Sequence, residues 1–302
     1  MKLVQTYEPQ KGYRAGVLEG ESVYPVTYEQ KGIRTLLDLV EYAGSVDLDL
    51  HEVVEELKSP DPLPVPWDKL NIPPDLNKPH LALPIHAPEV WACGVTYKRS
   101  AEFRDGDTQL SKGIYDSVYV AERPELFFKG RASHCTGPND IIGIRRDSHF
   151  TAVEPELAVL INARKKVLGY LVANDVSAWD IERENPLYLP QSKIFRACCS
   201  LGPVILTKDA LSDPNTLSIS CVIERLGKTI FAGETTLGMM KRSIEELIDF
   251  LFRSNTVPSG TVLLTGTGII QTEDAALKEG DTVAITIPEI GTLRNRAKRI
   301  DS

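Results

Sequence analysis

The 302-residue chain contains no apolar run of the roughly 18 to 20 residues that a membrane-spanning helix needs. Its first residues, Met1 to Tyr7, turn polar too soon for the apolar core of a secretory signal. It also lacks a dense cluster of Lys and Arg, and its formal net charge of −8 argues against a nucleic-acid-binding surface. We therefore expect a cytoplasmic protein whose partners include neither nucleic acid nor a membrane.

Cysteine is scarce and irregularly spaced. The five cysteines are odd in number and lack CxxC spacing, which disfavours a zinc site or a disulfide framework. We expect them to be buried free thiols in a reducing compartment. They are Cys93, Cys135, Cys198, Cys199 and Cys221. No GxGxxG or Walker loop follows a strand-like segment, so the sequence does not indicate nucleotide binding.

The composition divides the chain into three stretches. Residues 1–58 combine short strand patterns with a helical pattern, which predicts a small N-terminal α+β domain. Residues 59–88 are rich in proline and predict an extended linker or wrapping arm. Residues 89–302 consist mostly of short apolar runs and turns, which predicts a β-rich domain with few helices. The clearest helical pattern there, Ser243–Phe252, opens with a Ser-x-x-Glu capping box.

Three carboxylates lie on otherwise apolar, β-prone segments. Glu154 and Glu156 belong to the run 152–161, and Asp175 lies near the end of the run 169–177. Residues two apart in a strand point to the same face, so Glu154 and Glu156 project side by side and repel each other. A buried carboxylate is costly unless it is paired or bound to a cation. The pattern predicts an all-oxygen site suited to Mg²⁺, Mn²⁺ or Ca²⁺ rather than zinc.

Simpler interpretations of these carboxylates stay open at this point. Glu154 and Glu156 could lie on a solvent-facing edge strand, which Pro155 would tolerate. Asp175 could cap the turn that follows its strand.

Several motifs, in their order along the chain, resemble those of the fumarylacetoacetate hydrolase family over roughly residues 85 to 300. Each motif alone is weak, but the ordered series is specific. The matching segments are Gly94-Val95-Thr96-Tyr97 (Gly-x-Asn-Tyr in the family), Pro124–Lys129 (Pro-x-x-Phe-x-Lys), Glu154–Val159, Gly169–Ala178, Ser192–Phe195 with Gly202-Pro203, Thr265–Gly268, Gly280-Asp281 and Ile290–Asn295.

This resemblance implies an α+β, β-rich fold, the mixed β-sandwich roll of the family's C-terminal domain, and a homodimer. It implies that Glu154, Glu156 and Asp175 hold Mg²⁺ (or Mn²⁺ or Ca²⁺), and that the substrate is a small 2-oxo acid or β-diketo acid whose enolate the metal stabilises. Lys193 matches the family's active-site lysine, which can stabilise an oxyanion or move a proton. Thr267 matches a threonine near the substrate carboxylate.

Tyr97 and Lys129 lie in matching motifs and are the remaining predicted substrate-binding residues. Tyr97 could equally be a side chain that packs in the protein interior and does not touch the substrate. Lys193 has an alternative as well, a surface lysine beside the Cys198-Cys199 pair.

Departures from the family pattern carry further information. The carbon–carbon hydrolases of the family place a His three residues after the motif's Tyr and a Glu three residues later, and this pair activates the attacking water. Here the two positions are Ser100 and Phe103, neither of which is a useful general base. Counting along the family's Asn-Asp-x-x-Ala-Arg-Asp-x-Gln pattern, Trp179 replaces the Arg and Glu182 the Gln.

With the stretch 182–193, these departures resemble the sugar-acid branch of the family, the 2-keto-3-deoxy-pentonate dehydratases. Such an enzyme enolises its substrate at C3 and expels the C4 hydroxyl, so it needs no activated water. We predict a metal-dependent hydro-lyase that forms 2-oxoglutarate semialdehyde. In it Lys193 assists enolate formation, and Glu182 or Glu102 moves the proton or protonates the leaving hydroxyl. The polar segment Ser100–Tyr115 is expected to fold over the site as a lid.

Two classes of alternative accompany this prediction. One is a carbon–carbon hydrolase of acylpyruvates such as fumarylpyruvate, or an oxaloacetate decarboxylase. The other is a non-catalytic protein that binds 2-oxo acids.

Overall fold

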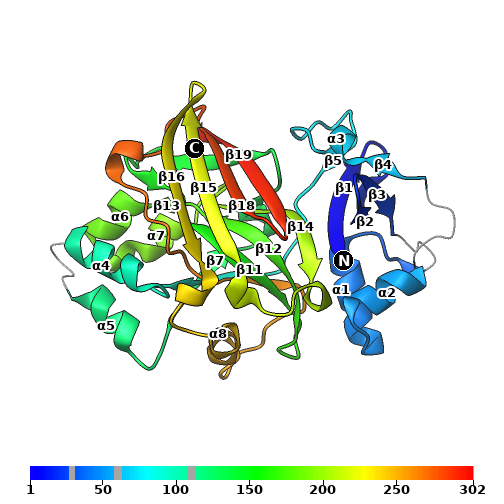
Figure 1. The fold of residues 1–302 in the computed structure, drawn as a ribbon, viewed down its shortest axis with the longest axis horizontal. Coiled ribbons are helices and arrows are strands. Elements are labelled where there is room, and N and C mark those ends of the chain that lie inside the picture. The colour runs from blue at the N-terminus through cyan, green and yellow to red at the C-terminus, as the bar shows by residue number, and fades with distance from the viewer. Residues whose placement is uncertain (27–30, 58–62, 108–112, 302) are drawn as a thin grey trace.

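The N-terminal part of the chain forms a small unit of strands and helices (Figure 1). The computed structural model describes residues 1–26, 31–57, 63–107 and 113–301. In the N-terminal unit, one face of α1 and of α2 is buried against the strands. Its elements are β1 (Lys2–Glu8), β2 (Gly12–Glu19), β3 (Ser22–Pro25), α1 (Leu36–Val46) and α2 (Leu50–Leu57).

The strands of this unit are not a separate sheet. They continue, through pairing of β1 with β14, into a twelve-stranded sheet with the order β4-β3-β2-β1-β14-β12-β11-β17-β6-β7. Two further strands, β5 and β8, pair with β1 and β14. The bounds of the additional strands are β4 (Val65–Pro66), β5 (His80–Leu81), β6 (Val90–Gly94), β7 (Glu125–Gly130), β8 (Cys135–Thr136), β11 (Pro155–Ile161), β12 (Val167–Asp175), β14 (Cys199–Thr207) and β17 (Thr261–Leu264).

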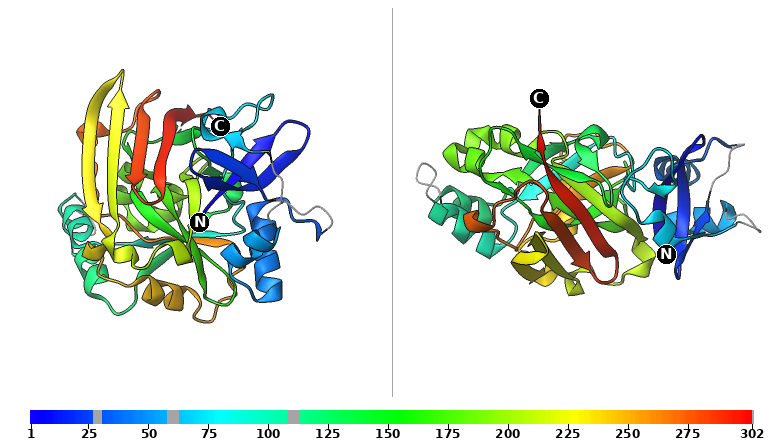
Figure 2. Two further views of the ribbon diagram at one scale, coloured as in Figure 1. Left: turned by 45° about the vertical axis from the view of Figure 1, so that its right-hand side comes forward. Right: turned by 90° about the horizontal axis from the view of Figure 1, so that it is seen from above.

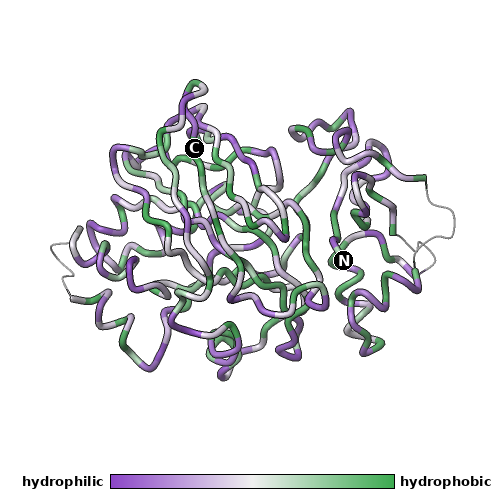
Figure 3. The backbone as a smooth tube through the Cα atoms, viewed as in Figure 1, coloured by the Kyte–Doolittle hydropathy of each residue, from purple (hydrophilic) through white to green (hydrophobic). Residues whose placement is uncertain are grey.

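A second, five-stranded sheet packs on the central strands of the first. Strands β11 and β12 contact β15, β18 and β19, and the inward side chains of both sheets form one hydrophobic core. Figure 3 shows hydrophobic residues along these central strands and hydrophilic ones in outer loops. The strand order is β16 (Lys228–Thr236), β15 (Ser218–Arg225), β18 (Thr282–Ile287), β19 (Gly291–Ile300) and β9 (Ile141–Arg145). The strand-rich mixed fold expected from the sequence is confirmed.

Short helices gather at one end of this sandwich, away from the N-terminal unit (Figure 1). They are α4 (Lys98–Asp107), α5 (Ile114–Val120), α6 (Trp179–Glu184) and α7 (Leu189–Lys193). Near these helices, the two-residue strands β10 (Thr151–Ala152) and β13 (Ser177–Ala178) form a small antiparallel sheet of their own. The predicted lid corresponds in its described parts to α4 and α5, while residues 108–112 lie outside the described residues.

The predicted C-terminal helix is α8 (Ile244–Leu251), capped by the Ser243 hydroxyl, which accepts a 3.1 Å hydrogen bond from the backbone N–H of Glu246. The Glu246 carboxylate pairs with Arg242 instead of closing the expected box. Within the described residues, no helix has the length and apolar character needed to cross a bilayer.

The proline-rich stretch makes local structure instead of one extended arm. Besides β4 and β5 it contains the one-turn helix α3 (Trp67–Leu70), whose Leu70 is buried. Residues 58–62 lie outside the described residues. Figure 2 shows the N-terminal unit and this stretch on one flank of the larger body.

Candidate active site

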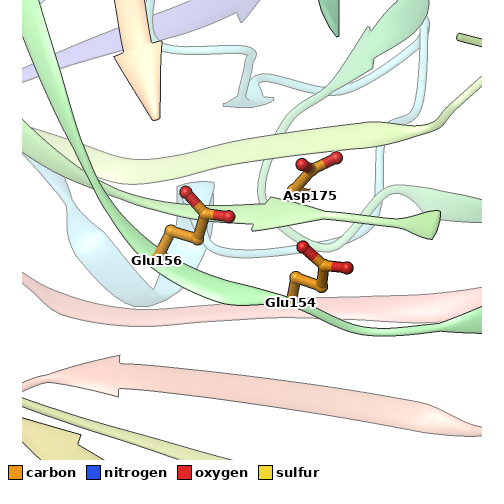
Figure 4. Close-up of side chains that lie close together, drawn as sticks. All are labelled: Glu154, Glu156 and Asp175. Carbon is orange, nitrogen blue, oxygen red and sulfur yellow. The ribbon is translucent and has the colours of Figure 1, made fainter. Parts of the chain in front are cut away.

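The three predicted metal-binding carboxylates converge where two central strands meet the helical end of the sandwich. Glu154 precedes β11, Glu156 is its second residue, and Asp175 is the last residue of β12. The strands are antiparallel neighbours, and the Asp175 N–H donates to the Glu154 carbonyl at 3.0 Å. One oxygen of each carboxylate lies within 4.8 Å of the others (Figure 4). The solvent-facing edge strand is therefore excluded, because β11 is a buried central strand.

Glu156 shows most directly that this cluster needs a cation. Its Oε2 accepts a 2.5 Å hydrogen bond from the Gly266 N–H, but its buried Oε1 has no donor among the described residues. Burial, together with the charges of Asp175 and Glu154, raises the pKa of Glu156 well above its usual range. Three converging carboxylates with an unpartnered buried oxygen fit a hard divalent cation such as Mg²⁺.

Lys193, at the end of α7, lies beside the same carboxylates. Its ammonium is 2.9 Å from Oε2 of Glu154 and 3.2 Å from Oδ2 of Asp175, and it donates to the Ser177 hydroxyl at 2.7 Å. Burial alone would lower the pKa of Lys193, but Asp175 and Glu154 raise it above its ordinary value. Lys193 is thus a fixed positive charge in the site and not a surface lysine.

Lys129 has a different place from the one expected. The side chain is fully buried behind Asp175, and its nitrogen lies 2.5 Å from Oδ1 of that residue. The same ammonium donates to the carbonyls of Val176 at 3.0 Å and Lys193 at 2.5 Å. The ammonium is thus held by one ion pair and two backbone carbonyls. We therefore reassign Lys129 from substrate binding to support of Asp175.

Helix α4 brings a third cation, Arg104, to the site. One nitrogen of its guanidinium lies 2.8 Å from Oε1 of Glu154, and another forms a very short ion pair with Glu182. The guanidinium lies over the indole of Trp179, 4.7 Å from the ring centroid. Glu182 is buried and also accepts a 3.3 Å hydrogen bond from Ser192. The predicted proton-transfer residue Glu182 therefore faces the cavity.

Glu125, at the start of β7, is the fifth carboxylate of the cavity. Its Oε2 occupies the space that a Cβ atom at position 94 would fill, so Gly94 is what admits this carboxylate. Burial and the charge of Glu182 raise the pKa of Glu125 to about 7, although Arg104 and Lys193 oppose the shift.

The side chains described so far include five carboxyl groups and three cations. Burial and this excess of carboxyl groups are why the pKa values of Glu125 and Glu156 lie above their usual range. The carboxylates are Glu125, Glu154, Glu156, Asp175 and Glu182, and the cations are Arg104, Lys129 and Lys193.

Other predicted residues divide between the cavity and its surroundings. Thr267 and Ser100 line the cavity, and Phe103 lines an adjoining pocket that shares Arg104, Glu154 and Thr267 with it. Tyr97 is buried and is not among the residues that line the cavity, and its hydroxyl has no hydrogen-bond partner in the described residues. Glu102 is exposed and pairs with Lys98 at 3.5 Å, which directs it away from the carboxylates.

Sequence reasoning missed Arg104 and Glu125. Arg104 lies one helical turn after Ser100, so the helical spacing of α4 could have placed both on one face. Glu125 stands in the matched segment Pro124–Lys129, four residues before Lys129, but nothing in that segment reveals the space left by Gly94.

Comparisons with known proteins agree with this geometry. A family model described as "Fumarylacetoacetate (FAA) hydrolase C-terminal" matches residues 90–298. The "2-dehydro-3-deoxy-D-arabinonate dehydratase" of Saccharolobus solfataricus is 45% identical over 227 residues, 74% of this chain and 76% of the relative. The "Probable 2-keto-3-deoxyxylonate dehydratase" of Haloferax volcanii is 40% identical over 274 residues, 91% of either chain.

A solved structure described as "2-keto-3-deoxy-D-arabinonate dehydratase complexed with magnesium and 2,5-dioxopentanoate" is also similar. It superposes with a TM-score of 0.84 at 36% identity, and the match covers 100% of both chains. By the family match and these two relatives, the chain belongs to the fumarylacetoacetate hydrolase family.

Proposed function

We propose that this protein is a Mg²⁺-dependent dehydratase that converts a 2-keto-3-deoxy-pentonate into 2,5-dioxopentanoate, which is 2-oxoglutarate semialdehyde. The observation that carries the proposal is the converging carboxylate cluster with an unpartnered Glu156 oxygen, in a cavity whose water-activating positions are Ser100 and Phe103. The two relatives named as dehydratases and the magnesium complex of the similar structure support it.

Glu154, Glu156 and Asp175 would hold the metal. Bound Mg²⁺ supplies a positive centre that draws electron density from the 2-oxo and carboxylate oxygens of the substrate, which acidifies the C3–H bond. The ammonium of Lys193 adds a second positive charge next to the same oxygens, and its raised pKa keeps it charged.

Elimination requires one proton to leave C3 and one to reach the departing C4 hydroxyl. Glu182, paired with Arg104, is placed to accept the first. Glu125 is suited to donate the second, because a carboxyl with a pKa of about 7 keeps its proton in a large share of molecules at neutral pH. The water that leaves is formed from the C4 hydroxyl and the Glu125 proton, and the C3 proton stays on Glu182. The resulting 5-hydroxy-2-oxopent-3-enoate becomes 2,5-dioxopentanoate by loss of one proton from C5 and of the C5 hydroxyl proton, with protonation at C3 and C4.

The alternatives fit this cavity less well. A carbon–carbon hydrolase needs a base that activates water, and the cavity offers Ser100 and Phe103 at the positions where the family's hydrolases carry one. A non-catalytic binding protein has no need for the raised pKa of Glu125 or for the buried ammonium of Lys193.

The test is turnover by the purified protein with Mg²⁺. We expect 2-keto-3-deoxy-D-arabinonate, which is the same compound as 2-keto-3-deoxy-D-xylonate because C4 is its only stereocentre, to yield 2,5-dioxopentanoate, detected by NMR, with activity lost in EDTA and restored by Mg²⁺. Lys193→Met is expected to abolish turnover, whereas Lys165→Met, which removes an exposed lysine paired with Asp249, keeps it. Cleavage of acylpyruvates or decarboxylation of oxaloacetate without pentonate turnover would overturn the proposal.

We also propose a homodimer acting in a reducing cytoplasm. The family resemblance supports the dimer, and five cysteines without a disulfide support the compartment. Light scattering after size-exclusion chromatography tests the first, and the distribution of a fluorescent fusion in cells tests the second.

A further inference from the structure

Arg104 joins three parts of the molecule that are distant in the sequence. It lies on α4, and its side chain is buried although α4 as a whole is polar. Its guanidinium contacts Glu154 at the start of β11, and Glu182 and Trp179 on α6. A planar fork with five N–H donors can bridge two carboxylates and stack on an indole at the same time, which an ammonium cannot do.

The contacts of α4 with α5 extend the reach of Arg104. The neighbouring Asp105 accepts hydrogen bonds from the backbone N–H groups of Gly113, Tyr115 and Asp116 at 2.8 to 3.1 Å, which caps the start of α5. The Arg104 guanidinium also lies 5.7 Å from the centre of the Tyr115 ring. Apolar packing of Ala101 and Tyr115 in one cluster with Phe150 and Trp179 also holds these helices to the sandwich, and Arg104 adds a charged link to the carboxylates.

We propose that Arg104 is a positioning residue for the reaction: it fixes the Glu182 carboxylate at the cavity and fastens α4 and α5 over the metal-binding carboxylates. This inference rests on the proposed dehydration, in which Glu182 accepts the C3 proton. Arg104 carries no proton in the reaction. Its effect is to hold Glu182 in one orientation while the same guanidinium covers Glu154.

The position of Arg104 also explains two departures from the family pattern together. Trp179 provides the flat surface on which the guanidinium lies, and Glu182 provides the anion that it pairs with. The Phe103 ring packs against the same indole, with the ring centroids 6.3 Å apart. Phe103, at one of the two positions that carry the water-activating pair in the family's hydrolases, therefore supports the indole on which Arg104 lies. Helix α4, which contains the positions Ser100 and Phe103, thus also bears the cation that pairs with Glu154 and Glu182.

The first experiment compares Arg104→Met and Arg104→Lys with Arg99→Met, a matched control that removes an exposed arginine of the same helix. We expect Arg104→Met to lower kcat by about 100-fold with a much smaller change in KM, because a misplaced proton-transfer group costs about that much. Arg104→Lys keeps the charge but not the fork, and we expect it to remain close to the Met variant. Wild-type kcat in either Arg104 variant would overturn the proposal.

A double-mutant comparison separates positioning from a general structural role. If Arg104 acts through Glu182, Arg104→Met costs little further activity in a Glu182→Gln background, and the two losses are not additive. Two losses that multiply would show that Arg104 acts independently of Glu182. Guanidinium ion added to Arg104→Ala should restore part of the activity, while the same concentration of tetramethylammonium should not.

The extent to which Arg104 restrains local opening of α4 can be measured without substrate. Hydrogen exchange of the α4 amides should be faster in Arg104→Met than in Arg99→Met, because local opening controls exchange of a surface helix. Equal exchange rates would overturn this part of the inference. Since the readout needs no turnover, it distinguishes a failure of the positioning role from a failure of the proposed dehydration.

Discussion

The ammonium of Lys193 lies 2.9 Å from one carboxylate oxygen of Glu154, while the Arg104 guanidinium lies 2.8 Å from the other. Burial would raise the pKa of Glu154, but these two cations lower it to about 2. Glu156, two residues along the chain, has its pKa shifted in the opposite direction, because burial and the charges of Asp175 and Glu154 all raise it. Two carboxyl groups two residues apart therefore have pKa values shifted in opposite directions by their surroundings.

Replacing Glu156 by Gln should separate metal binding from stability. Gln keeps the shape and the hydrogen bond to Gly266 but removes a buried charge that two carboxylates repel. We expect the free energy of unfolding in EDTA near pH 8 to rise by on the order of 1 kcal/mol, measured by denaturant titration. Calorimetric titration should show that Mg²⁺ binding is lost. The exposed Glu55→Gln is the control, and Mg²⁺ affinity equal to that of the wild type would refute the ligand assignment.

Glu125 should make the stability of the metal-free protein depend on pH. Its pKa is raised from 4.5 to about 7, so between these values the folded protein keeps a proton that the unfolded chain has lost. The cost of this carboxyl is absent below pH 4.5, grows as pH rises, and is complete above pH 7. Glu125→Gln should therefore be more stable than the wild type at pH 8, by up to about 3 kcal/mol, and equal to it near pH 4. An equal difference at both pH values contradicts the shift.

Lys129→Met should destabilise the fold strongly. The substitution leaves Asp175 buried without its closest cation, and removing one partner of a buried ion pair costs about 3 to 5 kcal/mol. Mg²⁺ should recover more stability in this variant than in the wild type, because the metal supplies the missing charge. Thermal unfolding with Mg²⁺ and with EDTA measures both effects, with Lys165→Met as the exposed control. A variant as stable as the control would remove the supporting role from Lys129.

Gly94→Ala tests the position of the Glu125 carboxylate. The new Cβ atom would overlap Oε2 of Glu125 and force that side chain to move. We expect kcat to fall by about 100-fold, since displacement of a proton-transfer group by about 1 Å has this effect. Gly44→Ala is the matched control because it lies in α1 with open space around it, and it should stabilise the protein by about 0.5 to 1 kcal/mol. Wild-type kcat in Gly94→Ala would contradict the assignment of Glu125.

The part of the site that depends on local spacing could be predicted from the sequence. Glu154 and Glu156 share a face because strand residues alternate, and Asp175 joins them because β11 and β12 are consecutive antiparallel strands. Lys193 was accessible only through the family resemblance. No periodicity in its short helix indicates that α7 turns it toward β12.

Contacts between segments that are far apart in the sequence could not be predicted from local spacing. Arg104 and Glu154 are fifty residues apart, and their pairing depends on how α4 lies on the sandwich. For Lys129, the matched motif indicated a conserved kind of residue but not which oxygens surround its nitrogen. The continuity of the N-terminal strands with the large sheet was missed for the same reason, because it depends on only two register pairs, Lys2 with Leu206 and Leu3 with Ile205.

That continuity has a practical consequence for the design of shortened proteins. Strand β1 pairs with the C-terminal end of β14, and the Met1 ammonium donates to the Thr207 hydroxyl at 2.8 Å. A protein trimmed to the family-matching residues 90–298 would expose the backbone N–H and C=O groups at this end of β14 along an apolar edge. Bare strand edges recruit other chains, so such a fragment should self-associate even though it retains every carboxylate of the site. The N-terminal unit thus acts as a shield against aggregation.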